Sequence, residues 1–254
     1  MSGPSASLIE RIVGLTRDDA IAAMLFGSCA RGDAGADSDV DVLQLVSNRP
    51  GTAVRDELTI VSYTPDVVKS MVRRRSLFTW HLHTEGIYIF DPSSVLRLAL
   101  DAHPGPDPRY AIDRLRILSA VLDVDGDEFL TVTRGLSRVA RFLLRTALYA
   151  AAFEAGTGTF NLKQAATAAD SSGHTWSVLT RLSSTPTPEW QTIVESRELL
   201  ADLVGILQDN PYGSLEAMAV RTETIDPELH ALCLHAIADD PSELDYASTQ
   251  IPVL

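Results

Sequence analysis

The chain has 254 residues, of which 45% are apolar, and a formal net charge of −13, which is enough length and apolar content for a buried core in two domains. The acidic balance argues against generic nucleic-acid binding, and two cysteines exclude a disulfide framework or a cysteine zinc site. Because no window approaches 18 apolar residues and no signal-peptide core follows Met1, the sequence predicts a cytoplasmic protein without membrane contact.

The first hundred residues alternate between helix and strand patterns. Residues 5–18 have the apolar spacing of an amphipathic helix, and the runs 20–26, 39–46 and 57–63 have the composition of strands. A Thr-Pro pair at 64–65 then opens a helix that continues through three arginines at 73–75, and a short strand follows at 87–90. This order predicts a small mixed β-sheet flanked by helices, in an α+β fold.

From residue 93 onward the pattern is almost wholly helical. A joint rich in proline and glycine at 103–108 marks the domain boundary, which gives domains at 1–104 and 105–254. We expect the second domain to be a helical bundle that binds a substrate or a partner. Its predicted helices are 127–155, 161–170, 174–183, 188–209 and 226–238.

The most informative chemistry lies where the first two strands meet the loop between them. Gly27 and Ser28 follow the first strand directly, and Asp39 and Asp41 begin the second. Residues two apart on a strand point the same way, so the two carboxylates form a hard oxygen site suited to Mg²⁺. Gly27 permits a close backbone approach, and Ser28 offers a hydroxyl and an amide to a phosphate. The segment therefore predicts binding of a metal–nucleotide complex.

At the level of motif, residues 27–32 read Gly-Ser-Cys-Ala-Arg-Gly and residues 37–41 read Asp-Ser-Asp-Val-Asp. This pair of motifs resembles the DNA polymerase β-like nucleotidyltransferase superfamily, in particular its minimal nucleotidyltransferase and aminoglycoside nucleotidyltransferase branch. The resemblance implies a two-metal Mg²⁺ site and transfer of a nucleoside monophosphate, with AMP favoured, from a nucleoside triphosphate to a hydroxyl, releasing pyrophosphate. Ser38, inside the second motif, is taken as a nucleotide ligand.

In that superfamily a third carboxylate on the neighbouring strand completes the metal site or accepts the proton of the attacking hydroxyl. Here Glu57 begins the third strand and is the first candidate, with Asp56 next. Thr59 and Val61 share the face of Glu57 and lack the required chemistry. A solvated acid at the strand entry is the alternative, and it would leave either a weak enzyme or a nucleotide-binding protein without catalytic activity.

Several cations are candidates for the phosphates. Arg31 lies one turn after Ser28, where it either binds a phosphate or anchors the turn. Arg141 and Arg145 belong to an arginine stripe on the longest helix, which faces either a phosphate chain or acidic side chains. Lys163 stands at a predicted helix start, and helical domains of related enzymes use a lysine on the triphosphate.

Two other features favour structural roles. His81 and His83, even with Glu85 close in the sequence, have no further metal ligand at a recognisable spacing. Cys29 is expected to pack beside Ser28.

The acceptor stays open at this stage between a protein side chain, a tRNA and a small molecule. Residues 151–254 hold four basic against fifteen acidic residues, which suits a cationic aminoglycoside and makes that antibiotic the runner-up. A homodimer and a separate toxin-like chain, as in a toxin–antitoxin pair, are the partner alternatives.

Overall fold

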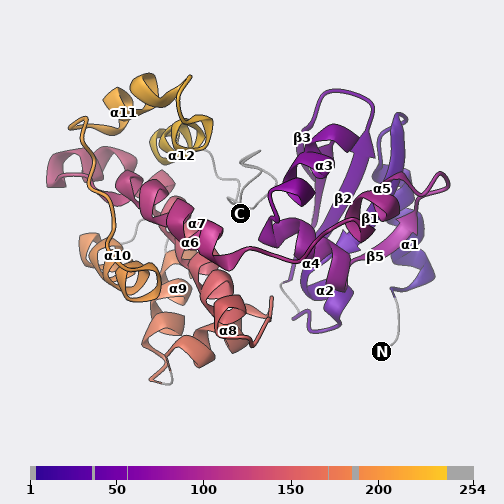
Figure 1. Ribbon diagram of the computed structural model, residues 1–254, viewed down its shortest axis with the longest axis horizontal. Coiled ribbons are helices and arrows are strands. Elements are labelled where there is room, and N and C mark those ends of the chain that lie inside the picture. Colours follow the sequence, from indigo (N-terminus) through magenta and orange to yellow (C-terminus); the bar gives the residue numbers. More distant parts are fainter. Residues whose placement is uncertain (1–3, 36–37, 56, 171, 185–188, 239–254) are drawn as a thin grey trace. The chain divides into compact units, whose positions relative to one another are not determined.

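The computed structural model describes residues 4–35, 38–55, 57–170, 172–184 and 189–238. Its contacts divide these residues into two compact units, one extending to Asp107 and the other beginning at Pro108 (Figure 1). The first unit contains all the strands of the described residues. The second is helical, so the α+β fold with a helical C-terminal region is confirmed.

The elements of the first unit are α1 (Ala6–Leu15), β1 (Ala20–Phe26), α2 (Gly27–Arg31), β2 (Val40–Val46), β3 (Gly51–Arg55), β4 (Leu58–Tyr63), α3 (Pro65–Arg73), α4 (Leu77–Glu85), β5 (Ile87–Phe90) and α5 (Val95–Asp101). Those of the second are α6 (Pro108–Leu118), the 3₁₀ helix η1 (Ser119–Leu122), α7 (Gly126–Glu154), α8 (Leu162–Ala169), α9 (His174–Ser184), α10 (Trp190–Val204), α11 (Leu215–Thr222) and α12 (Pro227–Ile237). No helix of the described residues is long and apolar enough to cross a membrane.

The strands form one mixed sheet in the order β3-β4-β2-β1-β5. β1 and β2 are antiparallel and pair Phe26 with Asp41, whereas β2 and β4 are parallel and pair Asp41 with Thr59. The edge strand β3 was not predicted from the sequence. Four of its five residues are exposed, so the strand lacks the alternation of buried and polar residues that marks a half-buried strand.

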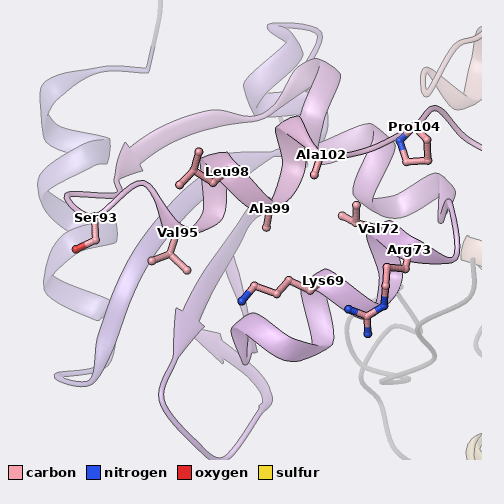
Figure 2. A pocket seen from close by; sticks show the side chains of 9 residues that line it. All are labelled: Lys69, Val72, Arg73, Ser93, Val95, Leu98, Ala99, Ala102 and Pro104. Atoms are coloured by element: carbon pink, nitrogen blue, oxygen red, sulfur yellow. The ribbon is translucent and has the colours of Figure 1, made fainter.

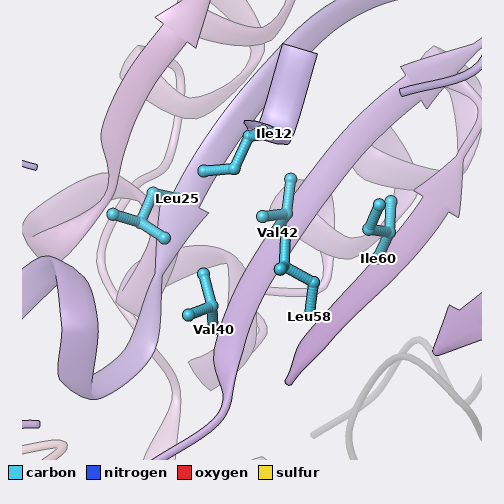
Figure 3. Packing of buried hydrophobic residues seen from close by; sticks show 6 residues of the cluster. All are labelled: Ile12, Leu25, Val40, Val42, Leu58 and Ile60. Atoms are coloured by element: carbon cyan, nitrogen blue, oxygen red, sulfur yellow. The ribbon is translucent and has the colours of Figure 1, made fainter. Parts of the chain in front are cut away.

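One face of the sheet is closed by α1. Ile12, the buried residue of that helix, packs against Leu25, Val42 and Leu58 in a cluster that also holds Val40 and Ile60 (Figure 3). On the opposite face Phe26 lies edge-on to Phe78 of α4, with ring centroids 5.6 Å apart. Because strand residues alternate between faces, burial of Val40 and Val42 under α1 places Asp41 on the α4 face.

The helix predicted to begin at residue 64 and to continue through residue 75 is followed by a separate helix, α4. α3 ends at Arg73, and Arg75 adopts a left-handed backbone with φ 61° that turns the chain. Ser76 then caps α4, because its hydroxyl accepts a hydrogen bond from the backbone N–H of Phe78 at 3.1 Å. The guanidinium of Arg75 donates a hydrogen bond to the carbonyl of Gly105 at 3.0 Å. This contact joins residues that are 30 positions apart in the sequence, and it stabilises the turn between the two helices.

The second unit is built around α7, whose length agrees closely with the predicted helix. The helix predicted over 188–209 ends sooner, at Val204, because Gly205 adopts a φ of +87° that ends the helix. α11 was not predicted; Ser214 caps it, and the backbone N–H of Leu215 donates to Glu128 of α7 at 2.7 Å. α12 packs so closely on α7 that a Cβ at Gly135 would overlap the carbonyl of Ala236.

The close approach at Gly135 leads to a first prediction. Gly135→Ala forces α12 away from α7 and lowers the free energy of unfolding by about 2 kcal/mol, although alanine is the better helix former. Gly14→Ala is the matched control, because a Cβ added at Gly14 of α1 would meet no atom within 4 Å, and it is expected to be neutral or stabilising. Thermal unfolding of the three proteins measures both effects, and an equal melting temperature for Gly135→Ala and the native chain would contradict the packing described.

Candidate active site

The site begins with a close approach between Gly27 and Asp41. Gly27 follows β1 and starts α2 with a φ of +73°, a conformation that glycine adopts without strain. A Cβ on this residue would lie 2.5 Å from Oδ2 of Asp41. The carboxylate on β2 is therefore seated against the backbone of the Gly-Ser turn, and only glycine leaves room for it.

The side chain of Cys29 in α2 lies beside the acidic motif. The thiol lies 3.5 Å from the carbonyl of Asp39. Burial raises the pKa of the Cys29 thiol, and the negative charges of Asp41, Asp39 and Asp33 raise it further. Both predicted metal ligands thus lie near α2. The nearby Asp33 was not assigned a role from the sequence.

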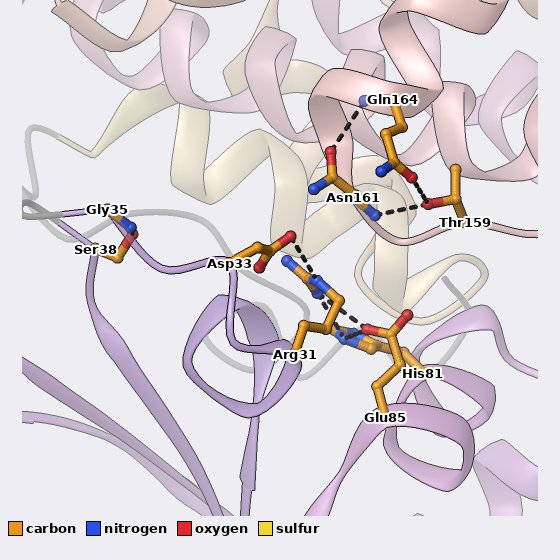
Figure 4. Close-up of polar contacts among 9 residues, drawn as sticks. All are labelled: Arg31, Asp33, Gly35, Ser38, His81, Glu85, Thr159, Asn161 and Gln164. Atoms are coloured by element: carbon orange, nitrogen blue, oxygen red, sulfur yellow. Dashed lines mark hydrogen bonds and ion pairs between the residues drawn. The ribbon is translucent and has the colours of Figure 1, made fainter. Parts of the chain in front are cut away.

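Ser38 lies just before the two carboxylates. Its hydroxyl accepts a hydrogen bond from the backbone N–H of Gly35 at 2.8 Å (Figure 4). Its role as a nucleotide ligand stays a prediction.

Arg31 is held by a polar cluster that we call the Arg31 cluster, formed by Arg31, Asp33, His81 and Glu85 (Figure 4). The guanidinium contacts Asp33 at 3.2 Å and Glu85 at 3.0 Å, and Nε2 of His81 lies 3.0 Å from the same carboxylate of Glu85. Burial opposes the charge on Glu85, but hydrogen bonds from His81 and Arg31 outweigh it and lower the pKa of this carboxyl. The cluster ties α2 to α4, which is the anchoring role considered for Arg31.

The Arg31 cluster also supports the structural role expected of the histidine segment. His81 and Glu85 stand four residues apart on α4, so both face α2. The spacing was visible in the sequence. The sequence did not indicate that Arg31, 50 residues before His81, completes the cluster.

Glu57, the first candidate for a third carboxylate, is engaged elsewhere. Its backbone carbonyl accepts a hydrogen bond from the N–H of Val40 at 2.8 Å, which places it just before β4 and next to the start of β2, beside the motif. Its carboxylate forms an ion pair with Arg11 of α1, the helix on the opposite face from Asp41. Asp56, the second candidate, lies outside the described residues.

The strand register decides which residue neighbours Asp41. Thr59 of β4 occupies that position. Among the residues that the structure describes, no group of three or more histidine, cysteine, aspartate or glutamate side chains is arranged to hold a metal ion. Asp39 and Asp41 are nevertheless enough for Mg²⁺, which usually takes only one or two protein carboxylates and completes its coordination shell with phosphate oxygens and water.

The remaining predicted nucleotide ligands belong to the second unit. Arg141 and Arg145 are partly buried on α7. Lys163 is exposed in the first turn of α8, a helix that Asn161 caps by accepting from the N–H of Gln164 at 3.0 Å (Figure 4). Their contact with a nucleotide stays a prediction.

Comparison with known proteins agrees with this geometry. Residues 11–94 match the family model described as Polymerase beta, Nucleotidyltransferase, a segment that runs from α1 to the start of α5. This segment belongs to the DNA polymerase β-like nucleotidyltransferase superfamily. The nucleotidyltransferase domain thus contains the Gly-Ser turn, both motif aspartates and the Arg31 cluster.

Two further comparisons concern the whole chain. Among solved structures, a nucleotidyltransferase-like protein from Exiguobacterium sibiricum 255-15 is 13% identical and covers 78% of this chain and 72% of its own, with a TM-score of 0.29. No curated protein matches the sequence.

The pairing of Arg11 with Glu57 leads to a second prediction. The hydrogen bond from Arg11 lowers the pKa of Glu57 from 4.5 to about 2. Because the folded-state pKa is the lower one, the pair stabilises the fold above pH 4.5 and this contribution is lost as the pH falls toward 2. Arg11→Gln should return the pKa of Glu57 toward 4.5, as measured by carboxyl NMR titration.

Arg17→Gln is the matched control, because Arg17 pairs with Asp19 at 2.8 Å. It should leave the titration of Glu57 unchanged. A native Glu57 that already titrates near 4.5 would show that its carboxylate is not held by Arg11.

Proposed function

We propose that the chain is a Mg²⁺-dependent nucleotidyltransferase that moves a nucleoside monophosphate, with AMP favoured, from a nucleoside triphosphate to an acceptor hydroxyl and releases pyrophosphate. The observation that carries the proposal is the seat of Asp41 against the backbone of Gly27. It supports the proposal because a turn suited to phosphate and a carboxylate suited to a metal ion are then adjacent, with no room for a Cβ between them. A nucleotidyl transfer needs both groups around the same phosphate chain.

Each residue of the turn has a defined part in this proposal. The backbone of Gly27 and the hydroxyl and amide of Ser28 would hold the β- and γ-phosphates, and Asp39 and Asp41 would hold the two Mg²⁺ ions. When bound, Mg²⁺ neutralises charge on the reacting phosphate and lowers the pKa of an attacking oxygen. Arg31, fixed by Asp33 and Glu85, keeps α2 in place and adds positive charge near the turn.

The site favours an acceptor whose hydroxyl has a low pKa. With Thr59 beside Asp41 and Glu57 paired to Arg11, the described residues supply no evident general base on the adjoining strand. A tyrosine phenol, with a pKa of about 10, needs less help to lose its proton than a sugar hydroxyl. This favours a protein acceptor over a tRNA or an aminoglycoside, and it fits a separate toxin-like chain as partner.

The same observation supports a second candidate, a nucleotide-binding protein that does not catalyse transfer. Its metal–nucleotide site would resemble that of the enzyme, so binding alone does not separate the two. Mg²⁺–ATP binding without pyrophosphate release in the presence of a cell lysate would favour the silent protein. Labelled ATP, GTP, CTP and UTP in the same lysate identify the nucleotide and the class of acceptor.

The third prediction tests the two motif carboxylates. Asp39→Asn and Asp41→Asn keep the shape of each side chain and remove its charge, so we expect transfer of labelled nucleotide to fall at least about a hundredfold. Asp18→Asn, a turn residue outside the site, is the control and should transfer normally. Chelation of Mg²⁺ should stop the reaction as well. Normal transfer by both site variants would refute the metal assignment.

The fourth prediction separates the strain of a left-handed glycine from the position of Asp41. Gly27 and Gly32 have φ of +73° and +78°, and only Gly27 has an atom of Asp41 in the way of a Cβ. We expect Gly27→Ala and Gly32→Ala to lower the free energy of unfolding similarly, by about 1–2 kcal/mol. Mg²⁺–ATP affinity should fall about tenfold or more in Gly27→Ala alone, as measured by calorimetry. Equal affinities in the two variants would show that the close approach of Asp41 to Gly27 does not matter for nucleotide binding.

A further inference from the structure

A cavity of about 600 Å³ lies between α3 and α5, within the nucleotidyltransferase unit (Figure 2). Its volume falls in the range of small-molecule sites. None of the predicted nucleotide or metal ligands lines it. The lining residues are Lys69, Val72, Arg73, Ser93, Val95, Leu98, Ala99, Ala102 and Pro104.

The two cations of the cavity stand together on one wall. Lys69 and Arg73 are four residues apart on α3, so their side chains leave the same face of the helix. Among the described residues neither side chain has a hydrogen-bond or ion-pair partner, whereas Arg11, Arg17 and Arg31 of the same unit are all paired. What sets Lys69 and Arg73 apart from other exposed cations of the unit is that both line the same cavity, so two positive charges without an acidic partner stand side by side there.

The facing wall is apolar. Val95, Leu98 and Ala99 of α5 line it, and Figure 2 shows them across the cavity from Lys69. Leu98 is 67% exposed, which leaves a large apolar side chain in water at the cavity. Among the described residues no acidic side chain lines the cavity, and Ser93 is its one uncharged polar lining residue.

We propose that this cavity binds an amphipathic anion: one molecule with an apolar body and a single carboxylate or sulfonate head. The body lies against Val95, Leu98 and Ala99, and the head lies between Lys69 and Arg73. A cationic ligand would meet the two positive charges. A nucleotide base would find little on the apolar wall to pair with its polar edge. The site is separate from the Gly-Ser turn, and its ligand is distinct from the nucleotide.

The test uses the full chain and decanoate as probe, with decyltrimethylammonium as a probe of equal chain length and opposite charge. Calorimetry should show saturable binding of one decanoate per chain and no competition by the cation. The double variant Lys69→Gln with Arg73→Gln should weaken decanoate binding about tenfold, because two exposed charge contacts are lost. Arg55→Gln removes one positive charge from the exposed strand β3, outside the cavity, and should leave the affinity unchanged.

A second measurement locates the probe in the native protein and does not depend on variants that fold. Saturating decanoate should shift the methyl NMR signals of Ala99 and Ala102, which line the cavity. Unmoved methyl signals, equal binding of the two probes, or equal decanoate affinity in the double variant and the native chain would each overturn the proposal. The result is independent of nucleotidyl transfer, because no step of that reaction is measured.

Discussion

The candidate site of the first unit depends on one constraint, the close approach of the Asp41 carboxylate to Gly27, a residue without a side chain. The antiparallel pairing of β1 and β2 sets Phe26 opposite Asp41, and the chain turns into α2 at the next residue, Gly27. Any larger residue would push the carboxylate out of the turn. The chemistry of the site therefore follows from a strand register and one glycine.

That register is itself fixed by the hydrophobic core. Val40, Val42, Leu58 and Ile60 are buried against Ile12 of α1, so a slip of one residue would turn the slipped strand's members of this set away from Ile12. The same burial that forms the core holds Asp41 on the opposite face. Core and site are thus two consequences of one alternation along β2.

The parts of the fold that rest on such local patterns were predictable. The strands at 20–26 and 87–90, the Gly-Ser turn and the long helix α7 were all indicated by alternation, spacing or caps. The break at Arg75 was not, because a positive φ at arginine has no local signal and depends on a contact with Gly105. The pairing of Glu57 with Arg11 was not predictable either, because it joins residues 46 positions apart in the sequence. The sequence indicates which residue types stand near the motif but does not indicate which distant cation each carboxylate meets.

The register of β2 and β4 also explains why no acidic residue of β4 neighbours Asp41. On β4 the residues that share its face are Thr59, Val61 and Tyr63, and none carries a carboxylate. A shift of β4 by one residue would bring Leu58 or Ile60 to that face and empty the core, so movement of the strand cannot supply the missing group. A further acid would have to come from outside the sheet. Asp33 raises the pKa of the Cys29 thiol, as Asp39 and Asp41 do, but its carboxylate forms an ion pair with Arg31. Among the described residues, the proposed site therefore has the two motif carboxylates alone, which favours an acceptor hydroxyl that loses its proton readily.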